Sequence, residues 1–352
     1  MARRRKKKSR FPAFLIFIII IAVIGFAGFN FWKGSLGNAY KPGDATNVAI
    51  NIPSGSSTGS IARALEENGI VRSATAFKYY VKFSGNDGKL QAGDYNLSPS
   101  MTGEQLVKAL LSGKNNTLKF TIPEGYSAEQ TARALADKGF GDYDAFIDVI
   151  ENGDFSYDFI DKLGYNGQGS RLEGVLFPDT YEVYEGSSEY QIIDKMLSEF
   201  DKVFTDEYYA RMSEMGLSLR DTLSIASIIE REAKINSDRP LISSVIYNRL
   251  NIGMKLQMCS TVQYILGEPK EFLTNKDISI ESPYNTYKNN GLPPGPICSP
   301  GKASIEAALY PADTDYLYFV VSEKLDGSHN FSSNSKDFEK DKAAYKQAVK
   351  NQ

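Results

Sequence analysis

The hydrophobic pattern begins with a continuous apolar run near the start of the chain. Residues 11–29, FPAFLIFIIIIAVIGFAGF, contain no charged side chain, and about 20 such residues cross the roughly 30 Å core of a bilayer as a helix. We therefore predict a transmembrane helix over residues 11–32, with Trp32 at the membrane interface. A cleaved signal peptide is the alternative, which the length of the run and the absence of a small-residue cleavage site disfavour.

The charges on either side of this run predict its orientation. Residues 1–10 contain seven Lys and Arg residues and no acid, whereas one lysine, Lys33, follows the run directly. By the positive-inside rule, we predict a single-pass protein of the cell membrane. Residues 1–10 form its cytoplasmic tail, and the chain after the membrane helix is extracytoplasmic. The whole chain has a formal charge of −3, so the part after residue 10 carries −10. An acidic outer part argues against nucleic acid as a partner.

After a linker rich in turn-forming residues (33–45), the pattern changes to short strands and amphipathic helices, and part of it repeats. The sequence IPSG at 52–55 leads to ARAL at 62–65, and IPEG at 122–125 leads to ARAL at 132–135. Each copy predicts a strand, a Pro-Gly turn, a Ser or Thr cap and a helix ended by glycine. Between the copies, Thr102 and Gln105 have the spacing of a capping box.

These elements predict an α+β fold in two parts beyond the linker. Residues 46–116 form a small βα module that we interpret as LysM-like, a type that binds N-acetylglucosamine polymers in other proteins, or alternatively as a spacer. Residues 117–352 form a larger domain. Within it, apolar residues spaced three and four apart predict a helical stretch over 187–215. A capping box of Ser218 and Asp221 predicts the start of the next helix.

Composition removes several classes of chemistry. A single histidine, His329, excludes zinc sites with several histidines. The two cysteines, Cys259 and Cys298, are too few for a Cys₄ cluster. The chain has no Gly-rich phosphate loop and no GxSxG nucleophile motif. We therefore predict neither a metal site nor a cofactor.

One carboxyl group stands out on the helix that follows Ser218. Ile225, Ile228, Ile229 and Glu232 fall at i, i+3, i+4 and i+7, which places Glu232 on the buried stripe. Burial raises the pKa of a carboxyl group and keeps the proton that a general acid needs. Glu230 points elsewhere on the same helix, where a salt bridge with a nearby arginine is the simpler interpretation.

Two later segments are typical of the walls of a sugar-binding groove. They are SPYNTY at 282–287 and GLPPGPI at 291–297, which combine aromatic faces, amide side chains and a Pro-fixed backbone. Sugar rings stack on aromatic faces and bind amide groups through their hydroxyls. A rigid loop that packs its own tyrosines is the alternative.

Taken in order, eight motifs over residues 46–345 give the outer part a family resemblance. The chain resembles the YceG-like family, the MltG-type endolytic murein transglycosylases, in LEGVLFPDTY, ASIIEREA, VIYNRL, GMKLQ, STVQY, SPYNTY, GLPPGPI and the closing YFV with HNF. The resemblance implies cleavage of nascent peptidoglycan between N-acetylmuramic acid and N-acetylglucosamine, with a 1,6-anhydro end as product. It also implies a membrane anchor and, as partners, glycan strands and peptidoglycan synthases.

The resemblance also suggests roles for single residues. The essential glutamate of the family lies in the E-x-E pair, which is carried to Glu232 with Glu230 as the reserve. Gln257, Tyr284 and Asn285 are candidates for orienting the sugar.

Cys259 and Cys298 replace an acidic and a small residue expected at these positions. Both lie in loops that border the presumed groove, and we predict a disulfide between them.

Two rival functions remain at this point. A muramidase that uses water needs a second acid, for which Asp179 or Glu173 would serve. A wall-binding scaffold without catalysis would recruit synthases through the LysM-like module, and it would not depend on Glu232.

Overall fold

The computed structural model describes residues 38–44, 46, 48–113, 117–184, 187–270 and 272–351. The predicted basic tail, the membrane helix over 11–32 and the first part of the linker lie outside these residues. Within the described part of the chain, no helix has both the length and the apolar character needed to span a membrane. The described residues divide into two compact units, one up to Thr117 together with Tyr184–Ser187, the other comprising Leu118–Val183 and Ser188–Gln352.

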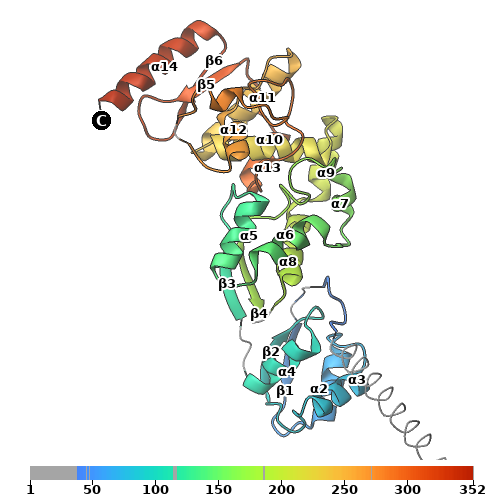
Figure 1. Cartoon of the computed structure of the whole chain (residues 1–352). Coiled ribbons are helices and arrows are strands. Elements are labelled where there is room, and N and C mark those ends of the chain that lie inside the picture. Colours follow the sequence, from blue (N-terminus) through green and yellow to red (C-terminus); the bar gives the residue numbers. More distant parts are fainter. Residues whose placement is uncertain are drawn as a thin grey trace, which may run out of the picture. The chain divides into compact units, whose positions relative to one another are not determined.

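The first unit is a small βααβ module followed by a third helix (Figure 1). Its elements are β1 (Val48–Ile52), α2 (Thr58–Glu67), α3 (Ala74–Phe83), β2 (Gly93–Leu97) and α4 (Gly103–Ser112). β1 and β2 pair in antiparallel register, with Ile50 opposite Tyr95. The predicted capping box of Thr102 and Gln105 is confirmed at the start of α4. The glycan-binding interpretation of this module stays a prediction.

The second unit is mainly helical, with two small sheets. Its first half contains β3 (Thr117–Thr121), α5 (Ala128–Asp137), α6 (Tyr143–Asn152), α7 (Asp158–Lys162), β4 (Thr180–Tyr184), α8 (Glu189–Val203) and α9 (Asp206–Glu214). Its second half contains α10 (Leu219–Glu232), η1 (Asn236–Asp238), α11 (Arg239–Asn251), α12 (Cys259–Leu266), η2 (Asp277–Ser279), α13 (Lys302–Leu309), β5 (Tyr318–Val321), β6 (His329–Ser332) and α14 (Ser335–Lys350).

The sequence repeat is a structural repeat. Both copies place a serine cap, Ser57 or Ser127, before a helix of ten residues, and the two helices keep the offset of 70. A second helix and a closing strand follow in both. Each closing strand carries a buried tyrosine whose hydroxyl donates to the carbonyl four residues earlier, over 2.8 Å from Tyr95 and 2.5 Å from Tyr181. The second unit therefore begins with a related module, in which the short helix α7 and a loop stand between the second helix and the closing strand.

The helical stretch predicted over 187–215 is confirmed, and in the structure it is divided into the two helices α8 and α9. Phe204, with φ −84° and ψ 79°, leaves the helical conformation after α8. Thr205 then takes the extended conformation of an N-cap, and the acids Asp206 and Glu207 occupy the first turn of α9. Acidic side chains at this position interact favourably with the helix dipole, so a new helix begins there.

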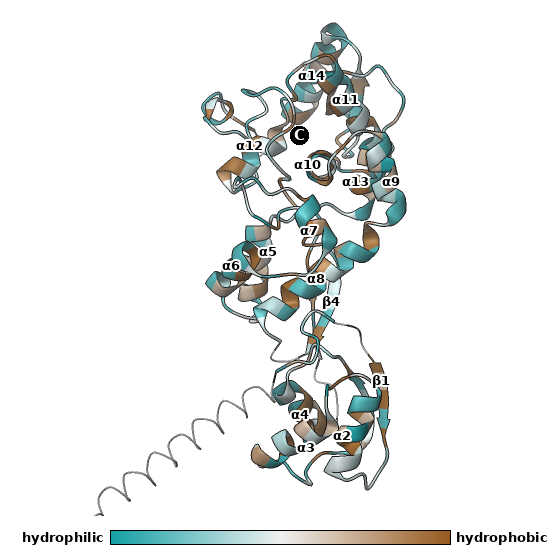
Figure 2. Cartoon of the chain, turned by 90° about the vertical axis from the view of Figure 1, so that its right-hand side faces the viewer, coloured by the Kyte–Doolittle hydropathy of each residue, from teal (hydrophilic) through white to brown (hydrophobic). Residues whose placement is uncertain are grey.

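Helix α10 is the central element of the second unit. It packs against α9, α11, α12 and α13, and Figure 2 shows it lying among α11, α12 and α13. Nine of its residues are buried, on all sides of the helix. Its buried hydroxyls, those of Thr222, Ser224 and Ser227, donate to carbonyls of the same helix. The capping box of Ser218 and Asp221 is confirmed at its start.

The single histidine links the β5–β6 hairpin to the start of α11. Both the backbone N–H of His329 and its Nδ1 lie within hydrogen-bond distance of Asp238 Oδ2, at 2.8 and 2.9 Å. The two side chains are buried, with 4% and 7% exposed. This contact gives His329 a structural role between the hairpin and the start of α11.

Replacing Asp238 by Ala is expected to destabilise the protein. The change leaves two buried groups of His329 without their acceptor, and an unsatisfied buried donor costs roughly 1–3 kcal/mol. Urea unfolding of the purified chain measures the effect. Asp313→Ala, at an exposed position, is the control and is expected to stay within about 0.5 kcal/mol of wild type. Equal midpoints for the two variants would contradict the structural role.

Candidate active site

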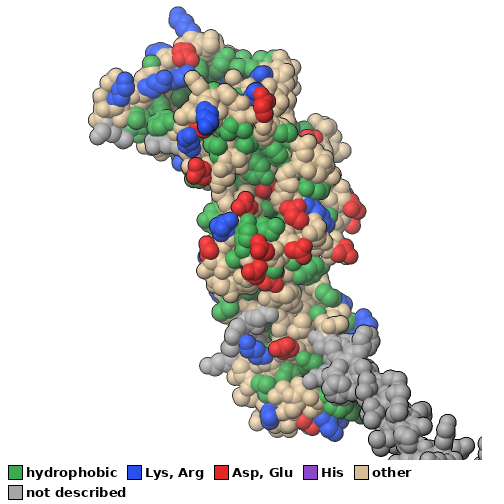
Figure 3. All heavy atoms as spheres, viewed as in Figure 1, with side chains coloured by type: hydrophobic (Ala, Val, Ile, Leu, Met, Phe, Trp, Pro, Cys, Tyr) green, Lys and Arg blue, Asp and Glu red, His purple; other side chains and the backbone are tan. Residues whose placement is uncertain are grey.

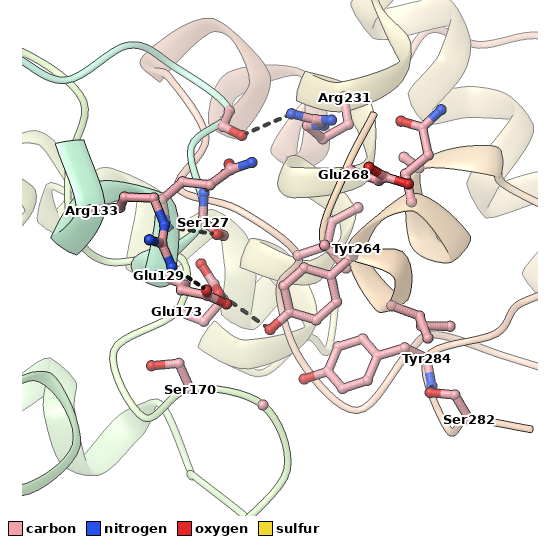
Figure 4. A pocket seen from close by; sticks show the side chains of 18 of the residues that line it. Ser127, Glu129, Arg133, Ser170, Glu173, Arg231, Tyr264, Glu268, Ser282 and Tyr284 are labelled. Atoms are coloured by element: carbon pink, nitrogen blue, oxygen red, sulfur yellow. Dashed lines mark hydrogen bonds and ion pairs between the residues drawn. The ribbon is translucent and has the colours of Figure 1, made fainter. Parts of the chain in front are cut away.

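A cavity of about 750 Å³ lies in the second unit, between the repeated module and the helices around α10. It is lined by the turn before α5, by α5 and α6, by the loop 169–173 and by α12, with Arg231, Ser282, Tyr284 and Ile297. Figure 4 shows its polar and aromatic side chains from close by. In the space-filling view, acidic side chains gather over the part of the chain that contains α5, α6 and α8 (Figure 3). The cavity is large enough for a sugar chain rather than a single small group.

Glu232 is not itself among the residues that line this cavity, but its neighbour Arg231 and its hydrogen-bond partner Ser260 are. It is the last residue of α10 and is half-buried. Its Oε1 accepts a hydrogen bond of 3.0 Å from the backbone N–H of Ser260, which lines the cavity. Among the described residues, Oε2 has no hydrogen-bond partner. The prediction that Glu232 lies on the buried stripe is wrong, because the buried part of α10 ends at Ile229 and Glu232 is the last residue of the helix.

Glu230 is the more buried carboxyl group of the pair. Its side chain is 6% exposed and forms an ion pair of 3.1 Å with Arg239. Its second oxygen accepts a hydrogen bond of 3.0 Å from the N–H of Gly301. The prediction of a salt bridge with an arginine is confirmed, but the expected solvated face is wrong. With both oxygens engaged, Glu230 holds α10, α11 and the start of α13 together.

Arg231, between the two glutamates, binds a third segment. Its Nη1 donates to the carbonyl oxygen of Gly125 over 3.2 Å, in the turn that leads to α5 and lines the cavity (Figure 4). Gly125 has φ +80°, a conformation that favours glycine. Three consecutive side chains of α10 thus fix three segments around the cavity.

Glu173 lies in the wall of the cavity and is almost fully buried, with 3% of its surface exposed. Oε1 accepts from the N–H of Ala128 over 2.9 Å, and Oε2 is 3.2 Å from the hydroxyl of Tyr264. Burial raises the pKa of Glu173 to about 8, against the lowering effect of these hydrogen bonds. The group is therefore mostly neutral at pH 7.

The other predicted sugar contacts are placed differently. Tyr284 lines the cavity, as predicted. Asn285 is fully buried, and its amide donates to the carbonyls of Ile278 and Ile280, so its side chain is not available to a sugar. Gln257 is exposed, with φ +50°, and Asp179 is exposed at the start of β4; neither lines the cavity.

The two cysteines are free, which contradicts the predicted disulfide. Cys259 is exposed and its Sγ lies 3.1 Å from the hydroxyl of Tyr287. Cys298 is buried and its Sγ is 3.5 Å from the carbonyl oxygen of Ser227 on α10. The two thiols therefore have separate partners: Cys259 lies at the start of α12, whereas Cys298 packs against α10.

Sequence reasoning missed Tyr264 and Ser260 as residues of the site. Both belong to α12 and line the cavity, and the ring of Tyr264 lies 4.9 Å from that of Tyr284. The segment STVQY contains both residues, but its spacing gives no sign of which side chains face the cavity. Their positions depend on contacts with α10 and with the loop before β4.

The buried Glu173 predicts a pH dependence of stability. In the unfolded chain a glutamate ionises near pH 4.3, whereas the folded protein retains the proton up to about pH 8. The folded state therefore binds more protons between these values, and stability falls as the pH rises through them, by up to about 1.4 kcal/mol per pH unit. Glu173→Gln removes this contribution. Urea unfolding from pH 5 to 9 should show the wild-type stability falling relative to the variant until about pH 8; parallel curves would contradict the assignment.

Comparisons with known proteins show relatives along most of the chain. The model of the YceG-like family matches residues 50–344. A Bacillus subtilis protein named endolytic murein transglycosylase is 38% identical over 310 residues, which are 85% of each chain. A Streptococcus pneumoniae protein of the same name is 33% identical, over 95% of this chain and 64% of that protein. The crystal structure of a YceG-like protein from Listeria monocytogenes is similar at a TM-score of 0.57 and 36% identity, covering 84% of this chain and 98% of that chain.

Proposed function

The chain belongs to the YceG-like family, and on that premise we propose that it is an endolytic lytic transglycosylase of peptidoglycan. It cleaves the bond between N-acetylmuramic acid and N-acetylglucosamine in nascent strands and leaves a 1,6-anhydro end. The observation that supports this most directly is the half-buried Glu232, whose hydrogen-bond partner Ser260 lines a cavity of sugar-chain size and whose second carboxyl oxygen is unpartnered among the described residues.

One carboxyl group accounts for the whole reaction. Protonated Glu232 gives its proton to the glycosidic oxygen as the bond to C1 of the muramic acid breaks. The resulting carboxylate takes the proton of the C6 hydroxyl, whose oxygen closes onto C1. Proton and bonds balance without water, and Glu232 returns to its starting form.

The surroundings of Glu173 support this route over hydrolysis with Glu173 as the second acid. A muramidase with two carboxyl groups needs a second one that is ionised and faces the substrate. Glu173 is buried, bonded to Tyr264 and mostly neutral at pH 7. Asp179, like Glu232, is not among the residues that line the cavity, whereas Glu129, Glu151 and Glu268 are, and the mass of the product distinguishes the two routes.

The membrane anchor belongs to the same proposal. The apolar run over 11–32 and the basic residues before it place residues 1–10 in the cytoplasm and the catalytic unit outside, where peptidoglycan is assembled. The association with peptidoglycan synthases is part of the proposal through the family resemblance alone.

A topology experiment tests the anchor. A reporter fused after Gln352 should be active only if it works outside the cell, because the positive-inside rule retains the N-terminus in the cytoplasm. The same reporter fused to a chain without residues 1–32 is the control and should report a cytoplasmic position. An active cytoplasmic reporter on the full chain would overturn the proposed compartment.

Glu232→Gln tests the catalytic assignment. The amide keeps the shape and removes the transferable proton, so turnover of uncrosslinked glycan should fall at least ~10²-fold. Mass spectrometry of the wild-type product should show the 1,6-anhydro end, which is one water lighter than a hydrolysis product.

Glu230→Gln is the matched control at the neighbouring acid. It weakens a buried ion pair, so we expect lower stability, with turnover by the folded protein reduced far less than in Glu232→Gln. If Glu230→Gln is inactive while folded and Glu232→Gln is active, the catalytic role moves to Glu230. Full turnover by both variants would reject both glutamates as the catalytic acid, and absence of turnover by the wild type would reject the enzyme and favour the wall-binding scaffold.

A further inference from the structure

Two tyrosines form an aromatic wall in the cavity. Tyr264 and Tyr284 both line it, with ring centroids 4.9 Å apart and an interplanar angle of 47°. The loop at Gly169 packs closely behind their hydroxyls: a Cβ atom at this position would lie 2.3 Å from the hydroxyl oxygen of Tyr284 and 3.3 Å from that of Tyr264. The wall therefore has little freedom to move toward the loop.

Glu173 is the group that connects this wall to the opposite side of the cavity. One oxygen binds the first turn of α5 through the N–H of Ala128, and the other binds the hydroxyl of Tyr264. Figure 4 shows the Tyr264 hydroxyl directed at the Glu173 carboxyl, with Tyr284 alongside. A single buried side chain thus sets the separation between α5 and the aromatic wall.

We propose that Glu173 is a positioning residue for glycan binding, which holds Tyr264, and through it Tyr284, in the orientation that stacks against a sugar ring next to Glu232. This role rests on the proposed function. An aromatic face whose orientation is already fixed binds the CH groups of a sugar at a lower entropic cost. Glu173 contributes to affinity through the tyrosines and takes no part in proton transfer.

The neutral form of Glu173 is the one that supports the wall. As a neutral acid it accepts from Ala128 and can donate to the Tyr264 oxygen. Among the described residues, no Lys, Arg or His forms an ion pair with it, and Glu151 on α6 opposes its ionisation. Ionisation therefore places an uncompensated charge in the wall.

The surrounding groups do not titrate in the same range. Burial raises the pKa of Tyr284 to about 12 and that of Tyr264 further. Burial also raises the pKa of the Cys298 thiol well above its ordinary value of 9.0. A change in glycan affinity between pH 7 and 9 consequently reports on Glu173.

The experiment measures the Kd for a tetrasaccharide of alternating N-acetylglucosamine and N-acetylmuramic acid. The full chain with Glu232→Gln serves as the parent, so that the sugar is not cleaved. If only the protein with neutral Glu173 binds the glycan, the Kd of the parent should rise about tenfold from pH 7 to pH 9. The reason is that the neutral fraction of Glu173 falls by that factor around a pKa of about 8. Adding Glu173→Gln should keep the affinity at pH 7 within about twofold and abolish the pH effect.

A second variant and a control complete the test. Glu173→Ala should raise the Kd at least ~10-fold at pH 7, since the link between α5 and Tyr264 is lost. Asp194→Asn changes another buried carboxyl that accepts from a tyrosine hydroxyl, away from the cavity, and should leave the Kd unchanged at both pH values.

The outcomes separate this proposal from the function on which it rests. Unchanged binding by Glu173→Ala, or a tenfold pH effect that persists in Glu173→Gln, would overturn the positioning role while leaving the transglycosylase proposal intact. If neither wild type nor the parent binds the tetrasaccharide at pH 7, the proposed function itself fails.

Discussion

The last turn of α10 is the constraint on which the site depends. Three consecutive side chains there each bind a different segment of the second unit. Glu230 binds Arg239 and Gly301. Arg231 binds Gly125, and Glu232 binds Ser260. Because α10 is buried along most of its length, the positions of these side chains are set by the core. Glu232, which has one oxygen without a hydrogen-bond partner among the described residues, therefore sits at the end of a rigid support, as the proposed catalytic role requires.

The repeated βααβ module gives the cavity its other side. In the second copy, the turn at Gly125, the cap at Ser127 and the start of α5 all line the cavity. The same elements of the first copy lie in a unit with its own core. A duplicated supersecondary structure has thus been incorporated into the larger domain, where the strand-to-helix turn became a wall of the site.

Glu173 shows how a buried acid can serve a binding site without reacting. Its environment raises the pKa to about 8, and the backbone of α5 and the hydroxyl of Tyr264 satisfy its oxygens. A neutral acid at this point avoids the cost of a buried charge. Glu232 is half-buried whereas Glu173 is almost fully buried, and this difference underlies the separate roles that we propose for them.

The sequence by itself determined the α+β class, the repeat and its helices, the caps at Thr102 and Ser218, and the family, because these depend on local patterns and on ordered motifs. It also indicated Tyr284 as a cavity residue. Tertiary structure alone decided that Glu230 is the more buried carboxyl of the pair and that the side chain of Asn285 is internal. It also decided that the two cysteines do not form a disulfide and that Tyr264 faces the cavity. A helical period places a side chain on a face of its own helix, but α10 is surrounded by neighbours, so burial depends on where those neighbours end.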